Sequence, residues 1–504
     1  MRVEAGRGDI APPPELRDGT PAQRQASAAS GDEADASQTR GVVAMAGGRQ
    51  VDLYAPRPDY DAPRDKARTL SGAFEAAYDT NATINQARAN LRAADEGIAV
   101  AKSGNRPTLL AEVDAGVQTV RDVNVPQGGG ASANLSDTRT PTRLSLNVTQ
   151  PLFRGFRTRN AIRQAEANVR AERDRLKAIE QQVFQEVAIA YVDVRRARGG
   201  VALREQEIAF LADQVNAARA RLTFGEGTRT DIDQAEARLA ETRAVLAAER
   251  SNLAEAEARL RELTGLDTAE LRRDIDVTRL LPRTLNAAIN VAMNENPTIH
   301  LAINEADEAN FNVKGIAGEA LPSLSVNGRL QGDIETTDSD RTEAAELRLV
   351  LQVPIYQGGR VSAQVREAKE TLGSRRIGVD VARDAVRADT VSAWATYVAS
   401  LETIEAAEQS VIAAQRAVAG LLEELRVGQR TTVDVLNAQR DLIDAQITRI
   451  EAIRQRDGAG FVVLRSMGRL DIGVLGINVE AYDPREHYSA VKDKWIGLRT
   501  PDGR

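Results

Sequence analysis

Apolar and polar residues alternate along four short segments of the chain, and alternation with a period of two predicts β-strands. We predict strands over residues 108–118, 142–150, 323–331 and 345–353. The residues on the apolar side are Leu109, Ala111, Val113, Ala115 and Val117 in the first strand, Leu144, Leu146 and Val148 in the second, Leu324, Val326, Gly328 and Leu330 in the third, and Leu347, Leu349, Leu351 and Val353 in the fourth.

One such strand alone would usually belong to a sheet with one face on a core and the other face in water. Four apolar faces need a cover, however, and the chain has no spare amphipathic helix to provide it. Lipid on one side and water on the other would satisfy the alternation, because membrane-spanning strands point apolar side chains outward and polar side chains inward.

Each pair of strands is followed by helical stretches in which apolar residues recur every three and four positions. We predict helices over 155–224 and 229–264 after the first pair, and over 359–427 and 431–467 after the second. The longer helix of each pair extends about 100 Å at a rise of about 1.5 Å per residue. Gly199-Gly200 predicts a bend or bulge, since each Gly weakens a helix by about 1 kcal/mol.

The two helices of each pair are joined by a short turn with recognisable cap residues. Gly225 and Gly428 suit the left-handed position that ends a helix. Thr228 with Asp231, and Thr431 with Asp434, have the spacing of a capping box at the start of the next helix. Each half of the chain therefore ends in a helical hairpin.

These elements form an internal repeat, because the same order of strands and helices occurs twice along the chain. Thr69 recurs at Thr284 and Pro107 at Pro322 (322 − 107 = 215), whereas Pro151 recurs at Pro354 (354 − 151 = 203). The difference of 12 residues falls between the paired strands, where residues 120–141 face the shorter segment 332–343. A surface hairpin loop would vary in length there.

The repeat divides the chain into four parts. Residues 67–281 form repeat 1 and residues 282–469 form repeat 2, each with one helix ahead of its strands. Residues 1–66 are rich in Pro, Gly, Ala and Ser without periodicity and are expected to be an extended, disordered tail. Residues 470–504 form a C-terminal tail.

The strand–helix junctions carry Pro, Gly and aromatic residues. Pro suits a first helical turn, because its missing N–H has no partner there. The aromatic residues lie just beyond strand ends, where an interfacial aromatic belt would form, although ordinary helix packing explains them equally well. The junction residues are Pro151, Phe153, Gly155 and Phe156 in repeat 1, and Pro354, Tyr356 and Gly358 in repeat 2.

Composition excludes several classes of protein. With Cys 0 the chain of 504 residues has no disulfide, thiolate zinc site or cysteine nucleophile. A net charge of −7 without any Lys-dense segment argues against nucleic-acid binding. His300 and His487 are the only histidines, and no nucleophile motif or glycine-rich phosphate loop is present, so we expect no enzyme and no cofactor.

The N-terminal residues do not show the pattern of a secretory signal peptide. Ala44-Met45-Ala46 resembles a signal-peptide cleavage site, but acidic and polar residues precede it instead of an apolar segment. This weighs against export, and we prefer a mature, truncated or misassigned start as its explanation. No stretch approaches the roughly 20 apolar residues of a membrane-spanning helix, so none is predicted.

Two motifs and the tandem repeat together resemble the TolC family over about residues 68–468. The motifs are Gln150-Pro151-Leu152-Phe153-Arg154-Gly155 and Val427-Gly428-Gln429-Arg430-Thr431-Thr432-Val433-Asp434-Val435-Leu436. The resemblance implies a homotrimer that is mainly α with a β-barrel part. Its 12-stranded outer-membrane barrel would continue into a long periplasmic α-helical barrel, in a Gram-negative bacterium. The implied partners are outer-membrane lipid, a periplasmic adaptor (membrane fusion) protein and an inner-membrane transporter, ABC-type or proton-driven.

The resemblance also implies a closed periplasmic entrance at the hairpin turns. Asp434 resembles the outer of two gate aspartates, Arg430 the linking arginine, and Thr230 with Asp231 its partners on the neighbouring hairpin. The second aspartate position is Asn437, and the expected tyrosine before Gly428 is replaced by Arg426 or Leu425, so the entrance would be less acidic and held differently. Simple helix capping is the competing interpretation of both aspartates.

A soluble coiled-coil scaffold or a periplasmic adaptor would share the Ala-rich hairpins, but the four alternating strands argue against both. The expected function is therefore the exit duct of a tripartite export system. The Pro-Leu-Phe-x-Gly junction favours type I protein secretion slightly over efflux of small molecules.

Overall fold

The structure is a computed structural model that describes residues 44–46, 49–51, 69–127, 131–268, 271–272, 275–335, 341–501 and 503. The chain separates into two compact units, one of residues 1–56 with Arg504 and one of residues 57–503. In the first unit, β1 (Ala44–Ala46) and β2 (Arg49–Val51) pair as a short antiparallel hairpin. The rest of the predicted tail lies outside the described residues.

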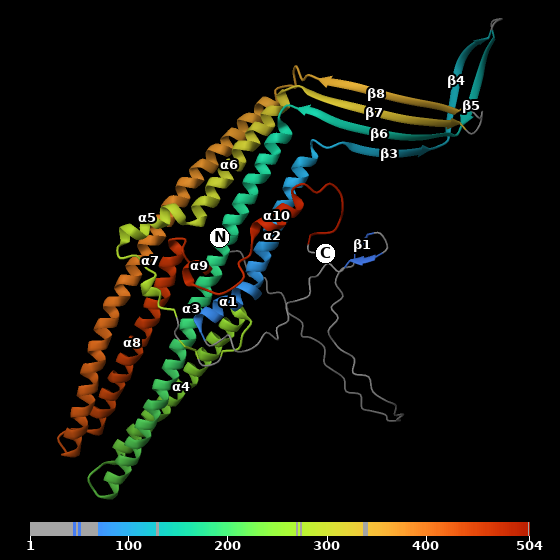
Figure 1. Cartoon of the computed structure of the whole chain (residues 1–504). Helices are drawn as coiled ribbons and strands as arrows, with labels where there is room; N and C mark the ends of the chain where they lie inside the picture. The colour runs from blue at the N-terminus through green and yellow to red at the C-terminus, as the bar shows by residue number, and fades with distance from the viewer. Residues whose placement is uncertain are drawn as a thin grey trace, which may run out of the picture. The chain divides into compact units, whose positions relative to one another are not determined.

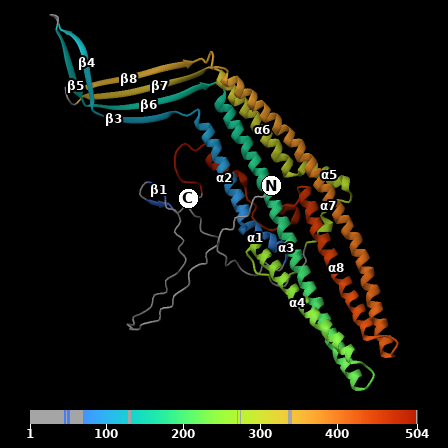
Figure 2. The same cartoon turned by 180° about the vertical axis from the view of Figure 1, so that it is seen from behind.

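Two long helical hairpins form most of the second unit (Figure 1). The first consists of α3 (Arg157–Thr223) and α4 (Arg229–Thr264), and the second of α7 (Arg360–Arg426) and α8 (Thr432–Ser466). Helix α3 packs against α4, α6, α2 and α8, and α7 packs against α8 and α6. Figure 2 shows the same layer of helices from behind. Among the described helices, none is long and apolar enough to cross a membrane.

The single helix predicted ahead of each strand pair is wrong, because each is broken in two. The pairs are α1 (Leu70–Thr80) with α2 (Ala82–Ser103), and α5 (Leu285–Glu295) with α6 (Pro297–Ala317). Asn81 and Asn296 stand at the breaks with extended backbone angles, and each side chain accepts hydrogen bonds from the next helix. Asn competes with the helix backbone in this way, so one residue ends one helix and starts another.

Both Asn side chains also hold the break in place. Asn81 Nδ2 donates to the Leu263 carbonyl at 3.1 Å, near the end of α4, and Asn296 Nδ2 donates to the Ser466 carbonyl at 2.8 Å, at the end of α8. The break in each repeat is therefore tied to the C-terminal end of the following hairpin.

A four-stranded antiparallel sheet extends from one end of these helices (Figure 1). Its strands are β3 (Thr108–Ala115), β6 (Pro141–Arg154), β7 (Ser323–Glu335) and β8 (Arg341–Gln352), in the order β3-β6-β7-β8. Within the part of the chain that the structure describes, β3 and β8 each have a hydrogen-bonded neighbour on one side only. The sheet therefore has two free edges.

The register of the strands gives this sheet one apolar face and one polar face. Leu109 lies opposite Val148, Leu146 opposite Leu330, and Val326 opposite Leu349. On the other face, Asn147 Nδ2 donates to Glu112 at 3.4 Å, Arg329 Nε donates to Asn147 at 2.8 Å, and Arg143 Nε donates to Asp333 at 2.8 Å. Apolar residues thus lie opposite apolar residues and polar residues opposite polar ones, as the alternation predicts.

The segment predicted as a variable loop is instead a second hairpin. Strands β4 (Gln118–Gln127) and β5 (Ala131–Arg139) pair antiparallel, with Gln118 opposite Arg139. The predicted strand 108–118 therefore ends at Ala115, and Gly116-Val117 separates β3 from β4. β4 contains Thr119, Val120, Val123 and Val125, and β-branched residues favour extended backbone.

Neither junction Pro occupies a first helical turn, which corrects that expectation. Pro151 lies inside β6 at a register shift, and Pro354 lies between the end of β8 and the start of α7. A missing backbone N–H is tolerated at an irregularity of the strand ladder as well as at a helix start.

The main hydrophobic core lies where α1, α3, α4, α5, α7 and α8 meet. The Phe74 ring packs 5.3 Å from Phe184 and 6.1 Å from Phe461, measured between ring centroids. The predicted C-terminal tail is folded as well: α9 (Ile472–Leu475) adds Leu475 to this core, and α10 (Pro484–Val491) packs on α2.

Candidate functional site at the hairpin ends

The two hairpin turns share one backbone conformation. Gly225 and Gly428 have φ of 78° and 74°, in the left-handed region where only Gly is free of strain. The following residue closes the turn in both cases, since the Glu226 N–H donates to the Arg221 carbonyl at 2.8 Å and the Gln429 N–H to the Glu424 carbonyl at 2.9 Å. This double turn satisfies carbonyls that the helix end would otherwise leave unpaired.

A capping box starts the second helix of each hairpin. The Thr228 N–H donates to the Asp231 carboxylate at 2.9 Å while the Asp231 N–H donates to Thr228 Oγ1 at 3.2 Å. Thr431 and Asp434 repeat the arrangement at 3.0 and 3.3 Å. The Thr228 hydroxyl and N–H lower the pKa of Asp231, and the Thr431 N–H and hydroxyl lower the pKa of Asp434. Both aspartates are therefore held as carboxylates.

The expected link from Arg430 to the neighbouring hairpin is absent from this chain. Arg430 Nε donates to Glu424 Oε2 at 2.8 Å, within its own hairpin, and Thr230 and Asp231 do not receive it. Glu424 lies in the last turn of α7, across the turn from Arg430. This ion pair therefore joins the two sides of the second turn.

A short apolar contact does join the two hairpins near their turns. Leu211 and Val215 of α3 and Ala235 of α4 form one buried cluster with Leu436 of α8. Leu436 follows Asp434 by two residues, so the two side chains point to nearly opposite sides of α8 and Asp434 faces away from this contact. The hairpin ends are thus packed against each other by apolar side chains and not by the predicted polar pair.

Helix α8 presents an acidic face that sequence reasoning missed. Asn437, Asp441 and Asp444 are exposed and Asp434 is half-buried, and their spacing of three, four and three residues places them on one side of the helix. The spacing is visible in the sequence, whereas the family motif points only to Asp434 and Asn437. The charge lost at Asn437 is therefore present one turn further along, at Asp441.

Polar links between the hairpins exist, but at mid-length. Arg454 Nε of α8 donates to Asp193 of α3 at 2.6 Å. Arg196 of α3 reaches Glu451 of α8 at 2.9 Å and Glu249 of α4 at 3.2 Å. These ion pairs fix the position of the second hairpin on the first, about halfway between the turns and the sheet.

Gly199-Gly200 lies beside these links. The predicted bulge is wrong, because α3 is a continuous α-helix through both residues. An added Cβ at Gly199 would lie 3.1 Å from Ile450 of α8, and one at Gly200 would lie 3.3 Å from Glu249. The two glycines therefore allow α8 and α4 to approach α3 closely.

The opposite end of the hairpins, at the sheet, is also closely packed. Gly155 (φ 59°) and Gly318 touch through their backbones, because an added Cβ on either would lie 2.3 Å from the carbonyl oxygen of the other. Phe156 has φ of 62° and packs edge-on against Phe153 at 5.1 Å. Gly358 has φ of 62° beside the exposed Tyr356, in the equivalent junction of repeat 2.

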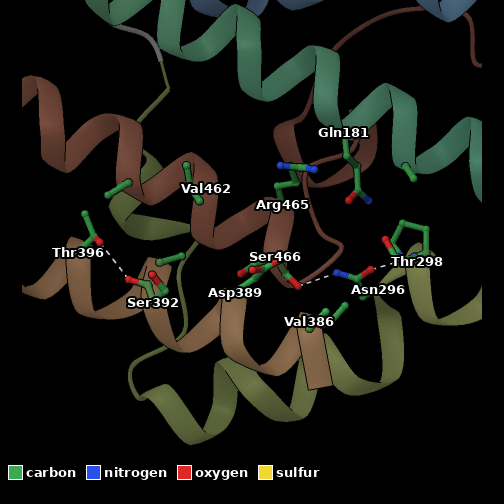
Figure 3. A pocket seen from close by; sticks show the side chains of 15 residues that line it. Gln181, Asn296, Thr298, Val386, Asp389, Ser392, Thr396, Val462, Arg465 and Ser466 are labelled. Atoms are coloured by element: carbon green, nitrogen blue, oxygen red, sulfur yellow. Dashed lines mark hydrogen bonds between the residues drawn. The ribbon is translucent and has the colours of Figure 1, made fainter. Parts of the chain in front are cut away.

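A polar cavity of about 400 Å³ lies where the α5–α6 break meets α3, α7 and α8 (Figure 3). Gln181, Asp389 and Arg465 line it, with Asn296 and Ser466 in the hydrogen bond described above. Asp389 and Arg465 are exposed, so the cavity opens to solvent. It lies away from the turns and holds no pair of groups positioned for acid–base chemistry.

The histidines lie apart from each other. His300 Nε2 contacts the Asn294 carbonyl at 2.8 Å, and His487 Nδ1 contacts Asp95 at 3.2 Å. In the residues that the structure describes, three or more His, Asp or Glu side chains never gather as a metal site requires.

Comparison with known proteins gives a family match over most of the chain. The sequence profile of outer membrane efflux proteins matches residues 74–266 and 288–468, one segment in each repeat. The outer membrane efflux protein BepC of Brucella suis is 40% identical over 87% of this chain and 93% of its own length.

More distant relatives point the same way. The outer membrane protein TolC of Vibrio cholerae is 27% identical over 68% of this chain and 83% of its own length. The alkaline protease secretion protein AprF of Pseudomonas aeruginosa is 26% identical over 60% of this chain and 64% of its own length. The crystal structure of the CmeC outer membrane channel of Campylobacter jejuni covers 90% of this chain and 94% of its own, with a TM-score of 0.69 at 14% identity.

Proposed function

We propose that this chain, which belongs to the outer membrane efflux protein family, is one protomer of a homotrimeric export duct that receives its cargo from an inner-membrane transporter through a periplasmic adaptor. The chain is an outer-membrane efflux channel by family, and the members of this family are channels rather than enzymes. The number of protomers, the partners and the cargo are the parts proposed here.

The sheet with two free edges carries the proposal of a trimer. An edge strand exposed to lipid would leave backbone groups unpaired, at several kcal/mol each. Four strands are too few to close around a water-filled lumen, whereas three copies supply twelve. The apolar face supports lipid contact, because Leu109, Val113 and Leu347 are 68%, 69% and 78% exposed in the single chain.

The hairpin turns are proposed as the periplasmic entrance. They stand at the far end of the helices from the sheet (Figure 1), so a membrane at the sheet places them deep in the periplasm. Three copies of Asp434 and Asp441 around one axis would concentrate negative charge and favour cations in the mouth. Within one chain the polar links between the hairpins are the mid-length ion pairs Asp193–Arg454 and Arg196–Glu451, and a link from Arg430 to Asp231 at the mouth stays a prediction.

Secreted protein is proposed as the cargo, ahead of small molecules. The name of AprF describes secretion of an alkaline protease, and the Pro-Leu-Phe-x-Gly junction at Pro151 slightly favours secretion. BepC carries only the description of an efflux protein, so small-molecule efflux is the second candidate.

Cross-linking of the sheet edges tests the trimer. Ala111 of β3 and Ala345 of β8 lie in one row across the sheet, through Leu146 and Leu330. The chain has no Cys, so Ala111→Cys with Ala345→Cys introduces the only thiols. A membrane-permeant bismaleimide should give a cross-linked ladder that ends at three chains, because a closed ring has no free edge.

The single variants Ala111→Cys and Ala345→Cys are the controls and should remain monomeric on denaturing gels. A ladder that continues beyond three chains, or native mass spectrometry in detergent with stable monomers alone, would contradict the trimer. Extraction of the protein from membranes without detergent would instead favour the adaptor or scaffold interpretation.

The cargo is tested in a strain that lacks the chain. Loss of individual proteins from the growth medium, with drug susceptibility unchanged, is the expected result. Increased drug susceptibility with an unchanged set of secreted proteins would contradict secretion and support small-molecule efflux.

A further inference from the structure

The segment after α10 exposes large apolar side chains near the C-terminus. Trp495, Ile496 and Leu498 are 66%, 89% and 95% exposed. Single apolar residues on a surface are ordinary, but a cluster within four positions of one another indicates a contact with something outside the chain.

This segment is fastened to the end of α2. Lys102 Nζ donates to Asp493 at 2.6 Å, and Arg106 Nη1 donates to the Lys494 carbonyl at 2.6 Å. The Arg106 guanidinium also lies 4.7 Å from the centre of the Trp495 ring. Figure 1 shows the red segment leaving α10 beside the end of α2 that leads into β3. The apolar cluster is therefore held in a fixed place.

That place is the boundary between helices and sheet. Arg106 precedes the first residue of β3, Thr108, by two positions. The apolar face of the sheet begins at the next residue, Leu109, and continues with Val113. Trp495 and its neighbours thus lie close to the start of β3, at the boundary between the helices and the sheet.

The charges around the cluster are positive. Lys492, Lys494 and Arg499 flank it, and the one acid, Asp493, is paired with Lys102. The whole chain has a net charge of −7, so this segment departs from the average. Trp beside Lys and Arg is typical of segments at a membrane surface, where the ring lies at headgroup level and the cations reach lipid phosphates.

Of the four junctions between the helices and the sheet, two carry aromatic residues and two, α2–β3 and α6–β7 (residues 318–322), do not. The β6–α3 junction has Phe153 and Phe156, and the β8–α7 junction has Tyr356, which is 85% exposed. The α2–β3 junction, residues 104–107, has the sequence Gly-Asn-Arg-Pro and no aromatic residue of its own. Trp495 supplies an aromatic side chain there from the other end of the chain.

We propose that residues 492–499 form a C-terminal membrane anchor, in which Trp495, Ile496 and Leu498 enter the periplasm-facing leaflet of the outer membrane and Lys494 and Arg499 bind its lipid phosphates. The anchor rests on the proposed function for the placement of the sheet in the membrane. It would hold the end of α2 against the lipid surface at a junction that lacks other aromatic residues.

A second copy of the chain is the alternative occupant. An apolar cavity of about 400 Å³ at the α6–α7 end is lined by Ala317, Ala320, Pro354, Ile355, Tyr356, Gln357, Gly359, Val361, Ser362 and Val365. Closure of the sheet would bring this cavity near the next protomer's C-terminus. None of these described lining residues is acidic, so the cavity offers no partner for Lys494 or Arg499, whereas lipid phosphates do.

Tryptophan fluorescence tests the anchor. The chain has two Trp, so Trp394→Phe leaves Trp495 as the only one. The full chain is reconstituted in phosphatidylcholine–phosphatidylglycerol vesicles with and without acyl-chain bromine, which quenches fluorescence on contact. We expect at least twofold quenching of Trp495 by the brominated lipid. The reverse variant, Trp495→Phe, should show little quenching of Trp394, which packs against the core.

Variants of the cluster provide the matched controls. In the Trp394→Phe background, Ile496→Ser with Leu498→Ser should reduce lipid quenching at least twofold. Ile303→Ser, on the surface of α6 at 37% exposure, should leave it unchanged. Lys494→Glu with Arg499→Glu should also reduce it, and only in vesicles that contain phosphatidylglycerol.

Three other results would overturn the anchor. Quenching of Trp495 by aqueous iodide, without quenching by lipid, would place the segment in water. Insensitivity to both quenchers, relieved by Tyr356→Ala, would place it in the neighbouring protomer's cavity. Conductance of the same vesicles separates this inference from the proposed function: vesicles that conduct while Trp495 stays unquenched overturn the anchor alone, and failure to insert overturns both.

Discussion

Helices α3 and α7 occupy equivalent positions in the two repeats, yet the chain covers them very differently. Both are 67 residues long, but α3 has 21 buried residues and α7 has 12. The apolar residues left on the surface of α7 are Ile377, Val381, Val391, Val398, Leu401 and Ile412, between 37% and 65% exposed, whereas α3 leaves only Leu222 in this class.

This difference shows where the single chain is incomplete. Helix α3 is covered by α4, α6, α2 and α8, whereas α7 packs against α8, α6 and α5 and follows the free edge strand β8 in the chain. An uncovered apolar stripe of this length indicates an interface. The two unpaired features, strand edge and helix face, lie on the same side of the chain, as the proposed trimer requires.

The largest expected effect is on stability, and it differs between a core residue of α3 and a surface residue of α7. Phe184→Ala removes a ring buried against Phe74 and should lower the free energy of unfolding by about 3 to 5 kcal/mol. Ile377→Ala, at 65% exposure, should leave a dissociated monomer unchanged but weaken the trimer. Denaturant unfolding and native mass spectrometry in detergent measure the two effects. Equal loss of monomer stability in both variants would contradict the contrast.

The second effect contrasts the two faces of β8. Leu349→Arg places a charge on the apolar face and should destabilise the assembled channel by about 2 to 4 kcal/mol. Arg348→Leu, on the polar face, should be milder because Arg348 pairs with Glu346 at the surface of the sheet. The yield of heat-resistant trimers in a membrane-assembly assay measures the effect of each substitution. Equal tolerance of the two substitutions would mean that the lipid-facing side is misassigned.

The third effect concerns a half-buried carboxyl of α3 without a counterpart in α7. Burial raises the pKa of Glu180 to about 7, and the equivalent position in α7 (383 − 180 = 203) is the exposed Arg383. A raised folded-state pKa means that the stabilising contribution is complete below about pH 4.5 and is lost as pH rises through 7.

Glu180→Gln removes this dependence. It should stabilise the protein by about 2 to 3 kcal/mol at pH 8 and change little at pH 4. Unfolding curves across this pH range measure the difference. Arg383→Gln is the control and should leave the pH dependence intact, and a wild-type pH profile in Glu180→Gln would show that another group titrates.

The smallest effects compare the two turns. Thr228→Ala and Thr431→Ala each remove a helix cap and should cost about 1 kcal/mol in thermal unfolding. Asp441→Asn keeps the caps, yet should reduce cation selectivity in planar bilayers because it removes one ring of charge. If both Thr variants alter selectivity as strongly as Asp441→Asn, the turns themselves control conduction and the acidic face of α8 does not.

Periodicity predicted the strands and long helices because each has one face that meets apolar surroundings along its whole length. The breaks at Asn81 and Asn296 were missed, because Asn fits a polar position in a helical pattern as well as it fits a cap. The β4–β5 hairpin and the folding of residues 470–491 were missed as well, since neither continues the repeat.

The candidate site was predictable only where it depends on neighbours in sequence. Gly225, Gly428 and the two capping boxes are local, so their spacing reveals them. The Arg430–Glu424 pair was missed, and the link from Arg430 to Asp231 stays a prediction because it depends on how two hairpins lie side by side. The pair Asp193–Arg454 joins residues 261 positions apart, which no local pattern records.

The backbone contact between Gly155 and Gly318, bordered by the side chains of Leu321 and Arg157, forms the corner from which α3 extends. Any tilt of α3 about this corner would use the helix as a lever arm of about 100 Å. A rotation of about 3° at the corner moves the far turn by about 5 Å, roughly one helical pitch. A hinge motion too small to disturb the sheet is therefore amplified into a wide displacement at the other end.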